Sequence, residues 1–186
     1  VRVNAASLAG EWPPGRVGDA VGAVEATAQL ARAHIAAVRE IRALKNPAIK
    51  VAIAKHWRDF QNKGGPLSWV SMKLTDWFFN RQIITAITTG KLLFWMPGSK
   101  LVREKIDLPE GRSTLDYLGI NYYGRTIVSF ITKAPFVQLE EGPGPRTDLN
   151  WEIYPEGLYN SLKDLKRYGL PLMITENGLA DAADRN

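Results

Sequence analysis

The sequence contains no cysteine, which excludes disulfide bonds, thiolate nucleophiles and thiolate metal ligands. Its only imidazoles are His34 and His56, so a zinc site would need carboxylates as most of its ligands. We therefore expect neither a metal nor a cofactor. No run of about 18 apolar residues occurs, and the first residues lack the apolar core of a signal peptide. We expect no membrane span and a cytoplasmic location, a reducing compartment that suits a chain without cysteine.

Clusters of charge of one sign are also missing. The net charge is +5 and the pI about 9.5, but lysines and arginines are scattered among acidic residues. This pattern indicates solvated helix faces rather than a nucleic-acid-binding stripe, so we expect no nucleic-acid partner. With 186 residues, 45% of them hydrophobic and 23% charged, the chain has the composition of a globular protein, and we expect residues 1–186 to belong to a single domain.

Three stretches have the pattern of amphipathic helices. Asp19 is a suitable N-cap for the first, whose apolar residues recur every three or four positions as far as Leu44. The second covers residues 68–88 and the third 155–168, and each is closed by a glycine that can end a helix. His34 lies beside the first apolar stripe, where a packed, hydrogen-bonded histidine is favoured over a catalytic one.

Three short apolar stretches, residues 50–54, 115–123 and 171–176, are typical of buried strands. They alternate with the helices at a spacing that predicts right-handed βαβ units and a parallel sheet. Residues 92–98 are closed by Pro-Gly and are interpreted as a connecting segment, and the Gly-Pro-Gly-Pro of residues 142–145 as a surface loop.

Polar side chains follow each of these strands. The last strand runs into Glu176 and Asn177, the middle one ends in Asn121 and Tyr123, and the first is followed by a cluster that contains Trp57. Because ligands bind outside the carboxyl ends of parallel strands, these residues are candidates for one binding site. Glu176 considered alone is equally compatible with capping a turn.

Several longer motifs resemble those of one known family. The stretch Ile174-Thr175-Glu176-Asn177-Gly178 resembles the nucleophile strand of the family 1 glycoside hydrolases, which are retaining β-glycosidases built on a (β/α)8 barrel. The other motifs that match, in the family's order, are Trp12-Pro13-Pro14-Gly15, Trp77-Phe78-Phe79-Asn80-Arg81, Asp116–Tyr123 and Trp151–Leu158. By this resemblance the chain is an α/β segment of a (β/α)8 TIM barrel. It would supply the fourth loop through the seventh strand, with three parallel strands and their helices.

The resemblance also implies an activity, the hydrolysis of β-glucosides or β-galactosides. Glu176 would be the nucleophile that forms a covalent glycosyl-enzyme intermediate. Tyr123 matches the residue whose hydroxyl donates to the nucleophile, and Asn121 matches a position near the reacting sugar. The residues expected to contact the substrate are Asn177, Trp57 and Trp151. The expected partner is a small-molecule or oligosaccharide β-glycoside.

The sequence departs from the family pattern in two places. It contains no Asn-Glu-Pro, the family's acid/base motif, which would fall just before Val1. We therefore expect an internal slice of a longer barrel that is inactive alone and needs the missing portion or an oligomer for stability. The second departure is Gly124, where many members carry Thr or Ser. It resembles a branch that includes membrane-lipid galactosyl transferases, so transglycosylation is an alternative, and a non-catalytic sugar-binding or assembly remnant is another.

Overall fold

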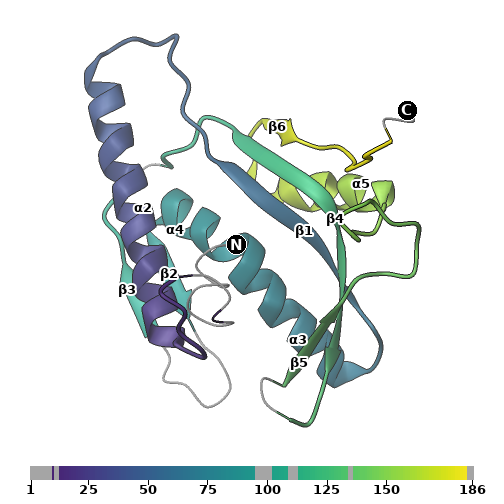
Figure 1. Ribbon diagram of the computed structural model, residues 1–186. Coiled ribbons are helices and arrows are strands. Elements are labelled where there is room, and N and C mark those ends of the chain that lie inside the picture. Colours follow the sequence, from purple (N-terminus) through teal and green to yellow (C-terminus); the bar gives the residue numbers. More distant parts are fainter. Residues whose placement is uncertain (1–9, 11–12, 95–101, 109–112, 134–135, 184–186) are drawn as a thin grey trace. The chain divides into compact units, whose positions relative to one another are not determined.

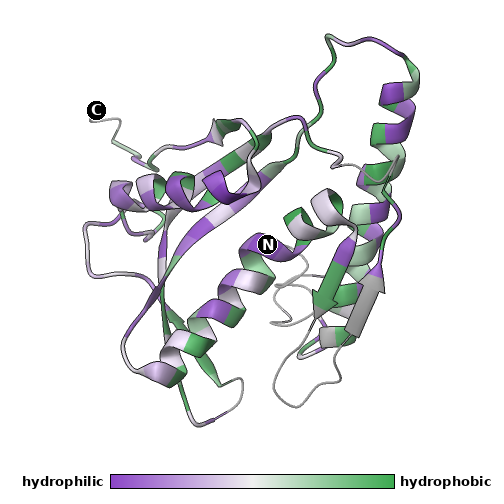
Figure 2. Cartoon of the chain, turned by 180° about the vertical axis from the view of Figure 1, so that it is seen from behind, coloured by the Kyte–Doolittle hydropathy of each residue, from purple (hydrophilic) through white to green (hydrophobic). Residues whose placement is uncertain are grey.

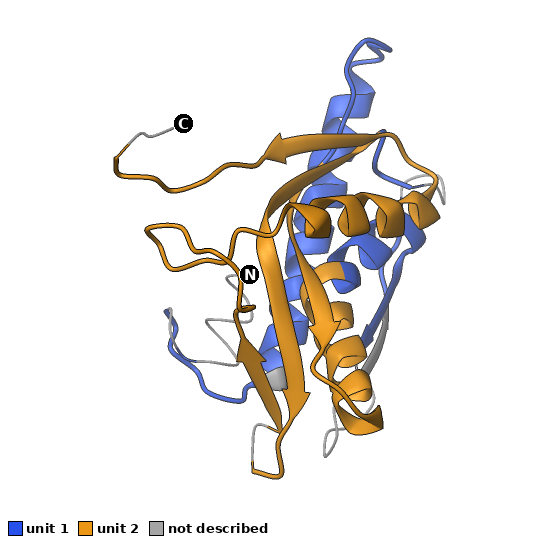
Figure 3. Ribbon diagram, turned by 90° about the vertical axis from the view of Figure 1, so that its right-hand side faces the viewer, with its two compact units in different colours: residues 1–52, 81–116 blue, residues 53–80, 117–186 orange. Residues whose placement is uncertain are grey.

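Each of two structural units combines residues from two separate stretches of the sequence (Figures 1 and 3). The computed structural model describes residues 10, 13–94, 102–108, 113–133 and 136–183. Unit 1 comprises residues 1–52 and 81–116, and unit 2 comprises residues 53–80 and 117–186. Trp12, both chain ends and residues 95–98 of the expected connecting segment lie outside the described residues. That the whole chain belongs to one domain stays a prediction.

Unit 1 is organised on helix α2 (Ala20–Ala43), which confirms the first predicted helix. The Oδ1 atom of Asp19 accepts a hydrogen bond from the Gly22 amide at 2.8 Å and so caps the helix. Hydrophobic residues recur along α2 between hydrophilic ones (Figure 2), and its buried residues form one stripe, Ala23, Val24, Ala28, Ala31, Ile35 and Val38. His34 is half-buried, with Nε2 2.9 Å from the Thr114 hydroxyl. Because that hydroxyl donates to the Ile87 carbonyl, Nε2 is the donor, as expected for a structural histidine.

Helix α4 (Gln82–Thr89) and a two-stranded antiparallel sheet also belong to unit 1. Gly90 ends α4 with φ 68°, and a Cβ there would lie 2.5 Å from the Ile106 carbonyl oxygen, so conformation and packing both require glycine. Strand β2 (Lys91–Phe94) pairs with β3 (Val102–Lys105). Residues 92–94 therefore belong to a strand, and the prediction of a connecting segment is wrong for them. The sequence did not reveal this pairing, because β3 lacks the alternation of apolar and polar residues that is typical of a strand.

Strand β4 (Leu118–Phe130) is the centre of unit 2. Strand β1 (Ala54–Asn62) lies parallel to it along one edge, and β6 (Leu172–Glu176) lies parallel to its first residues. Strand β5 (Val137–Glu140), which the sequence did not predict, pairs antiparallel with the end of β4. The three expected parallel strands are thus confirmed. Helices α3 (Pro66–Asp76) and α5 (Pro155–Leu165) both contact β1 and β4.

Three predicted boundaries are wrong. The first strand begins at Ala54 rather than at residue 50, so its polar cluster lies within the strand and not in the loop after it. The middle strand continues to Phe130 because β1 and β5 pair along its second half. The helix predicted over residues 68–88 is divided by a π-helical turn, Trp77–Arg81. Over the described residues, no helix combines the length and the hydrophobicity needed to cross a bilayer.

The π-helical turn is tied to β1 by Asn80, whose side chain is fully buried. Its Oδ1 accepts from the Arg58 amide at 3.2 Å, and its Nδ2 donates to the Arg58 carbonyl at 2.8 Å. The ladder between β1 and β4 shifts register between Trp57 and Asp59, on either side of Arg58. Asn80 therefore satisfies backbone groups at an interruption of the sheet, which gives a physical reason for widening the helix at this point.

Candidate active site

Strand β6 delivers Glu176 to the side of Tyr123. The Tyr123 hydroxyl donates a hydrogen bond of 3.0 Å to Glu176 Oε2, and this bond raises the pKa of the Tyr123 phenol. Asn121 is the register partner of Glu176, and β6 shifts register immediately before this pair. Register shifts of this kind are β-bulges, which change the direction of the side chains beside them and are common at the rims of sheets. The bulge in β6 therefore directs the Glu176 carboxylate away from the regular ladder.

Two amides adjoin the carboxylate. The Thr175 hydroxyl donates to Asn121 Oδ1 at 2.6 Å, which leaves the Asn121 NH2 group directed away from Thr175. Asn177 Nδ2 donates to the Tyr122 carbonyl at 2.8 Å and so fastens the end of β6 to β4. One N–H of the Asn177 amide is thus engaged by the backbone, which leaves its second N–H and its carbonyl oxygen for a ligand.

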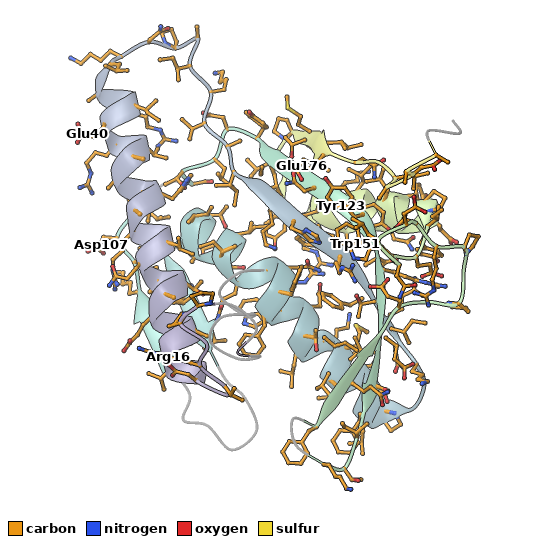
Figure 4. The ribbon with its side chains drawn as sticks, in the orientation of Figure 1. Arg16, Glu40, Asp107, Tyr123, Trp151 and Glu176 are labelled. Carbon is orange, nitrogen blue, oxygen red and sulfur yellow. The ribbon has the colours of Figure 1, made fainter. Side chains whose placement is uncertain are left out.

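Aromatic rings extend the site from Tyr123. The centroid of the Trp151 ring lies 5.6 Å from that of Tyr123, and the centroid of the His56 ring lies 6.0 Å from it. Figure 4 shows Glu176, Tyr123 and Trp151 following one another on unit 2. Rings with one polar edge are suited to the apolar faces and hydroxyl edges of a sugar.

In the polar cluster of β1, His56 and not its neighbour Trp57 lies toward the candidate site. Trp57 is buried, with 2% of the residue exposed, so it offers no surface to a sugar and the prediction that it contacts the substrate is wrong. His56 is instead the partner of Asn121 in the register and faces Tyr123. Successive side chains of a strand point to opposite faces, so His56 and Trp57 cannot both face the site. Which of the two is buried depends on the register of the strand with its neighbours.

The His56 imidazole is neutral over the physiological range. Burial lowers its pKa to about 4, with further lowering from the charges of Lys55 and Arg58. A neutral imidazole has one donor and one acceptor, which can bind a sugar hydroxyl without adding charge beside Glu176. Among the described residues, no three histidine or acidic side chains gather as a potential metal site.

Taken together, the parallel strands and the helices that contact them define a segment of an α/β barrel. Residues 1–186 match the model of glycosyl hydrolase family 1 along their whole length. The chain belongs to this family.

Relatives of known structure support the fold. The beta-glycosidase from Pyrococcus horikoshii aligns with 98% of this chain and 41% of its own, with a TM-score of 0.81 and 27% identity. The beta-glucosidase from Thermotoga maritima in complex with glucoimidazole gives a TM-score of 0.75 and 26% identity over 98% of this chain and 42% of its own. These similarities confirm that the chain is part of a (β/α)8 barrel.

A similarity in sequence covers a shorter region. The beta-galactosidase of Pyrococcus woesei is 31% identical over 128 residues, which are 59% of this chain and 24% of the relative. The chain therefore spans about a quarter of the length of the curated relatives that it matches.

Proposed function

We propose that the chain is part of a retaining β-glycosidase acting on β-glucosides or β-galactosides, with Glu176 as the nucleophile. The observation that carries the proposal is the 3.0 Å hydrogen bond from Tyr123 to Glu176 at the tip of a parallel strand. A carboxylate that must attack has to be ionised and held in one rotamer, and a phenol donor favours both conditions. The names of the relatives, beta-galactosidase and beta-glucosidase, support the same reaction class.

The reaction has two displacements. A Glu176 oxygen attacks the anomeric carbon, the bond to the leaving oxygen breaks, and a second carboxyl group protonates that oxygen. The second group then removes a proton from the water that releases the sugar from Glu176. The sequence holds no Asn-Glu-Pro motif for this second role. Residues 1–186 alone are therefore expected to be inactive, with the acid/base supplied by polypeptide beyond them.

Around the nucleophile, three side chains are assigned to the sugar. Asn121 offers its NH2 group, His56 a neutral donor and acceptor, and Trp151 an aromatic face. Asn177 is assigned first to fastening β6, because its amide donates to the backbone of β4. The T. maritima relative solved with glucoimidazole supports a site that accepts a sugar-like ring.

Strand β6 is the proposed junction with the rest of the barrel. Among the described strands it pairs only with β4, and Met173 and Ile174 are 50% and 47% exposed. Apolar residues on an open strand are an aggregation hazard unless another strand or helix covers them. We assign the cover to further barrel segments or to a second copy of the chain.

The residue that suggested transglycosylation, Gly124, does not support that activity in the structure. Gly124 has a packing reason of its own, because a Cβ there would lie 3.1 Å from the backbone oxygen of Glu152. Because packing alone explains Gly124, this glycine is no evidence that a sugar hydroxyl replaces water as the acceptor of the glycosyl group. Product analysis separates the two activities, since hydrolysis gives free sugar and transfer gives an oligosaccharide or a galactolipid.

Covalent trapping tests the proposal. The natural polypeptide that carries residues 1–186 is incubated with 2-deoxy-2-fluoro-β-glucosyl fluoride, whose leaving group departs without a proton from the enzyme. We expect mass spectrometry to find one fluoroglucosyl adduct on the peptide containing Glu176. The matched control is Glu156→Gln on helix α5, which should still be labelled, whereas Glu176→Gln should not. An adduct on another residue, or none, contradicts the assignment.

A further inference from the structure

The segment between β5 and α5 carries Trp151 on a small hairpin. Arg146 and Glu152 form an antiparallel bridge, and the Thr147 amide donates to the Trp151 carbonyl at 2.9 Å. Asn150 adopts φ 60°, the left-handed conformation that reverses the chain just before Trp151. The hairpin thus presents the Trp151 ring to Tyr123, with 5.6 Å between the ring centroids.

The residue next to Trp151 is an almost fully buried acid. Glu152 is 1% exposed, and its carboxylate accepts from Arg125 Nε at 2.7 Å, from Arg125 Nη2 at 2.8 Å and from the Gly144 amide at 2.8 Å. The Arg125 hydrogen bonds are the main reason that the pKa of Glu152 is lowered. Cβ atoms at Gly142 and Gly144 would lie 2.0 and 2.7 Å from this carboxylate. The Gly-Pro-Gly loop therefore wraps around the charge, which is a use of these glycines beyond a surface turn.

Arg125 is held as firmly as its partner. Its Nη1 donates to Gln61 Oε1 at 2.9 Å, and its guanidinium lies 3.9 Å from the Tyr154 ring centroid. Arg125 also stands two residues after Tyr123 on β4, and the register of β4 with β1 shifts between Tyr122 and Arg125. Strand β4 makes two neighbouring contacts with the hairpin, from Tyr123 to Trp151 and from Arg125 to Glu152.

We propose that the Arg125–Glu152 ion pair is a positioning pair, which fixes the Trp151 ring beside Tyr123 before a sugar binds. This inference rests on the proposed function. A buried ion pair is a poor source of stability, because apolar residues of similar volume often replace such pairs without loss. Its bidentate geometry does restrict orientation, since a guanidinium and a carboxylate meet in one plane. A pair joining β4 to the base of the hairpin therefore sets the angle at which the neighbouring indole meets the site.

The test follows Trp151 directly. In the natural polypeptide labelled with 5-fluorotryptophan, the ¹⁹F resonance of Trp151 is identified by its loss in Trp151→Phe, because residues 1–186 contain six tryptophans. We expect Glu152→Gln to shift and broaden this resonance. The matched control is Glu140→Gln, which breaks an exposed 2.7 Å ion pair with Lys63 in the same unit. It should leave the Trp151 resonance unchanged.

Trapping kinetics supply a second readout. With 2-deoxy-2-fluoro-β-glucosyl fluoride, Glu152→Gln should raise KI about tenfold, the usual effect of losing a charged hydrogen bond, and leave kinact nearly unchanged. If the pair were merely structural, Glu152→Gln would lower the melting temperature and would move neither the Trp151 resonance nor KI. That result would overturn the proposal.

A second variant covers the case in which Glu152→Gln does not fold. Arg125→Lys keeps the charge but loses the planar fork, so it should move the same resonance and KI in the same direction, to a smaller extent. An unchanged resonance in folded Arg125→Lys would also count against the pair. If the unaltered protein forms no adduct, the proposed function fails, while the fluorine measurement still decides whether the pair positions Trp151.

Discussion

Lys55 is the residue for which the structure makes its strongest energetic prediction. It lies on β1 with 9% of the residue exposed, and burial lowers the pKa of its ammonium group to about 7. Its Nζ donates to the His56 carbonyl and lies 4.7 Å from the centroid of the Phe79 ring. The negative charge of Asp76 opposes the lowering but does not cancel it.

The perturbation is Lys55→Met, which keeps the length of the side chain and removes the amine. Between pH 7 and 10.5 the unfolded chain binds a proton at Lys55 that the folded chain binds weakly, so stability rises with pH across this window. At 1.36 kcal/mol per pH unit, the lowering to about 7 corresponds to about 4 kcal/mol less stability at pH 7 than at pH 10.5. Lys55→Met should not show this contribution.

Two measurements check this prediction in the natural polypeptide. The first is the ¹³C titration of ε-labelled lysine, in which the resonance missing from Lys55→Met should titrate near pH 7. The second is the difference in free energy of unfolding between the variant and the unaltered protein, which should grow as the pH falls from 10.5 to 7. Asp76→Asn is the control for the sign, because removing that charge should lower the pKa of Lys55 further. A Lys55 resonance that titrates near 10.5 would refute the reasoning.

Two further predictions concern the site and its loop. Tyr123→Phe removes the 3.0 Å hydrogen bond to Glu176, and because this contact is exposed to solvent we expect a loss of about 1 kcal/mol, or about a fivefold lower kinact in trapping; an unchanged kinact would show that the phenol does not hold the nucleophile. Gly142→Ala would place a methyl group 2.0 Å from the Glu152 carboxylate and should cost about 1–3 kcal/mol in denaturant unfolding. Gly178→Ala, which meets nothing within 4 Å, should cost less, and equal losses would contradict the wrapped-carboxylate geometry.

The order of elements could be predicted from sequence because it depends on local patterns. The stripe of α2 and its cap at Asp19 are encoded within neighbouring residues, as are the glycines that end helices. Strand β5 and the pair β2–β3 were missed because four-residue strands carry little periodicity and exist through their partners. The π-helical turn was missed for a similar reason. Its Asn80 hydrogen-bonds the backbone of Arg58 where the ladder of a distant strand is interrupted, and no local pattern in the helix shows this.

For the site, the local pattern of polar and apolar residues placed Glu176 at the end of its strand, and it placed Asn121 and Tyr123 on a neighbouring parallel strand. The tertiary structure alone decided that Trp57 is buried while His56 faces Tyr123, because register assigns the two faces of a strand. It also joined Arg125 to Glu152, residues that no local pattern relates. Contacts between side chains far apart in the chain depend on how strands and loops pack, and that packing is a property of the folded whole.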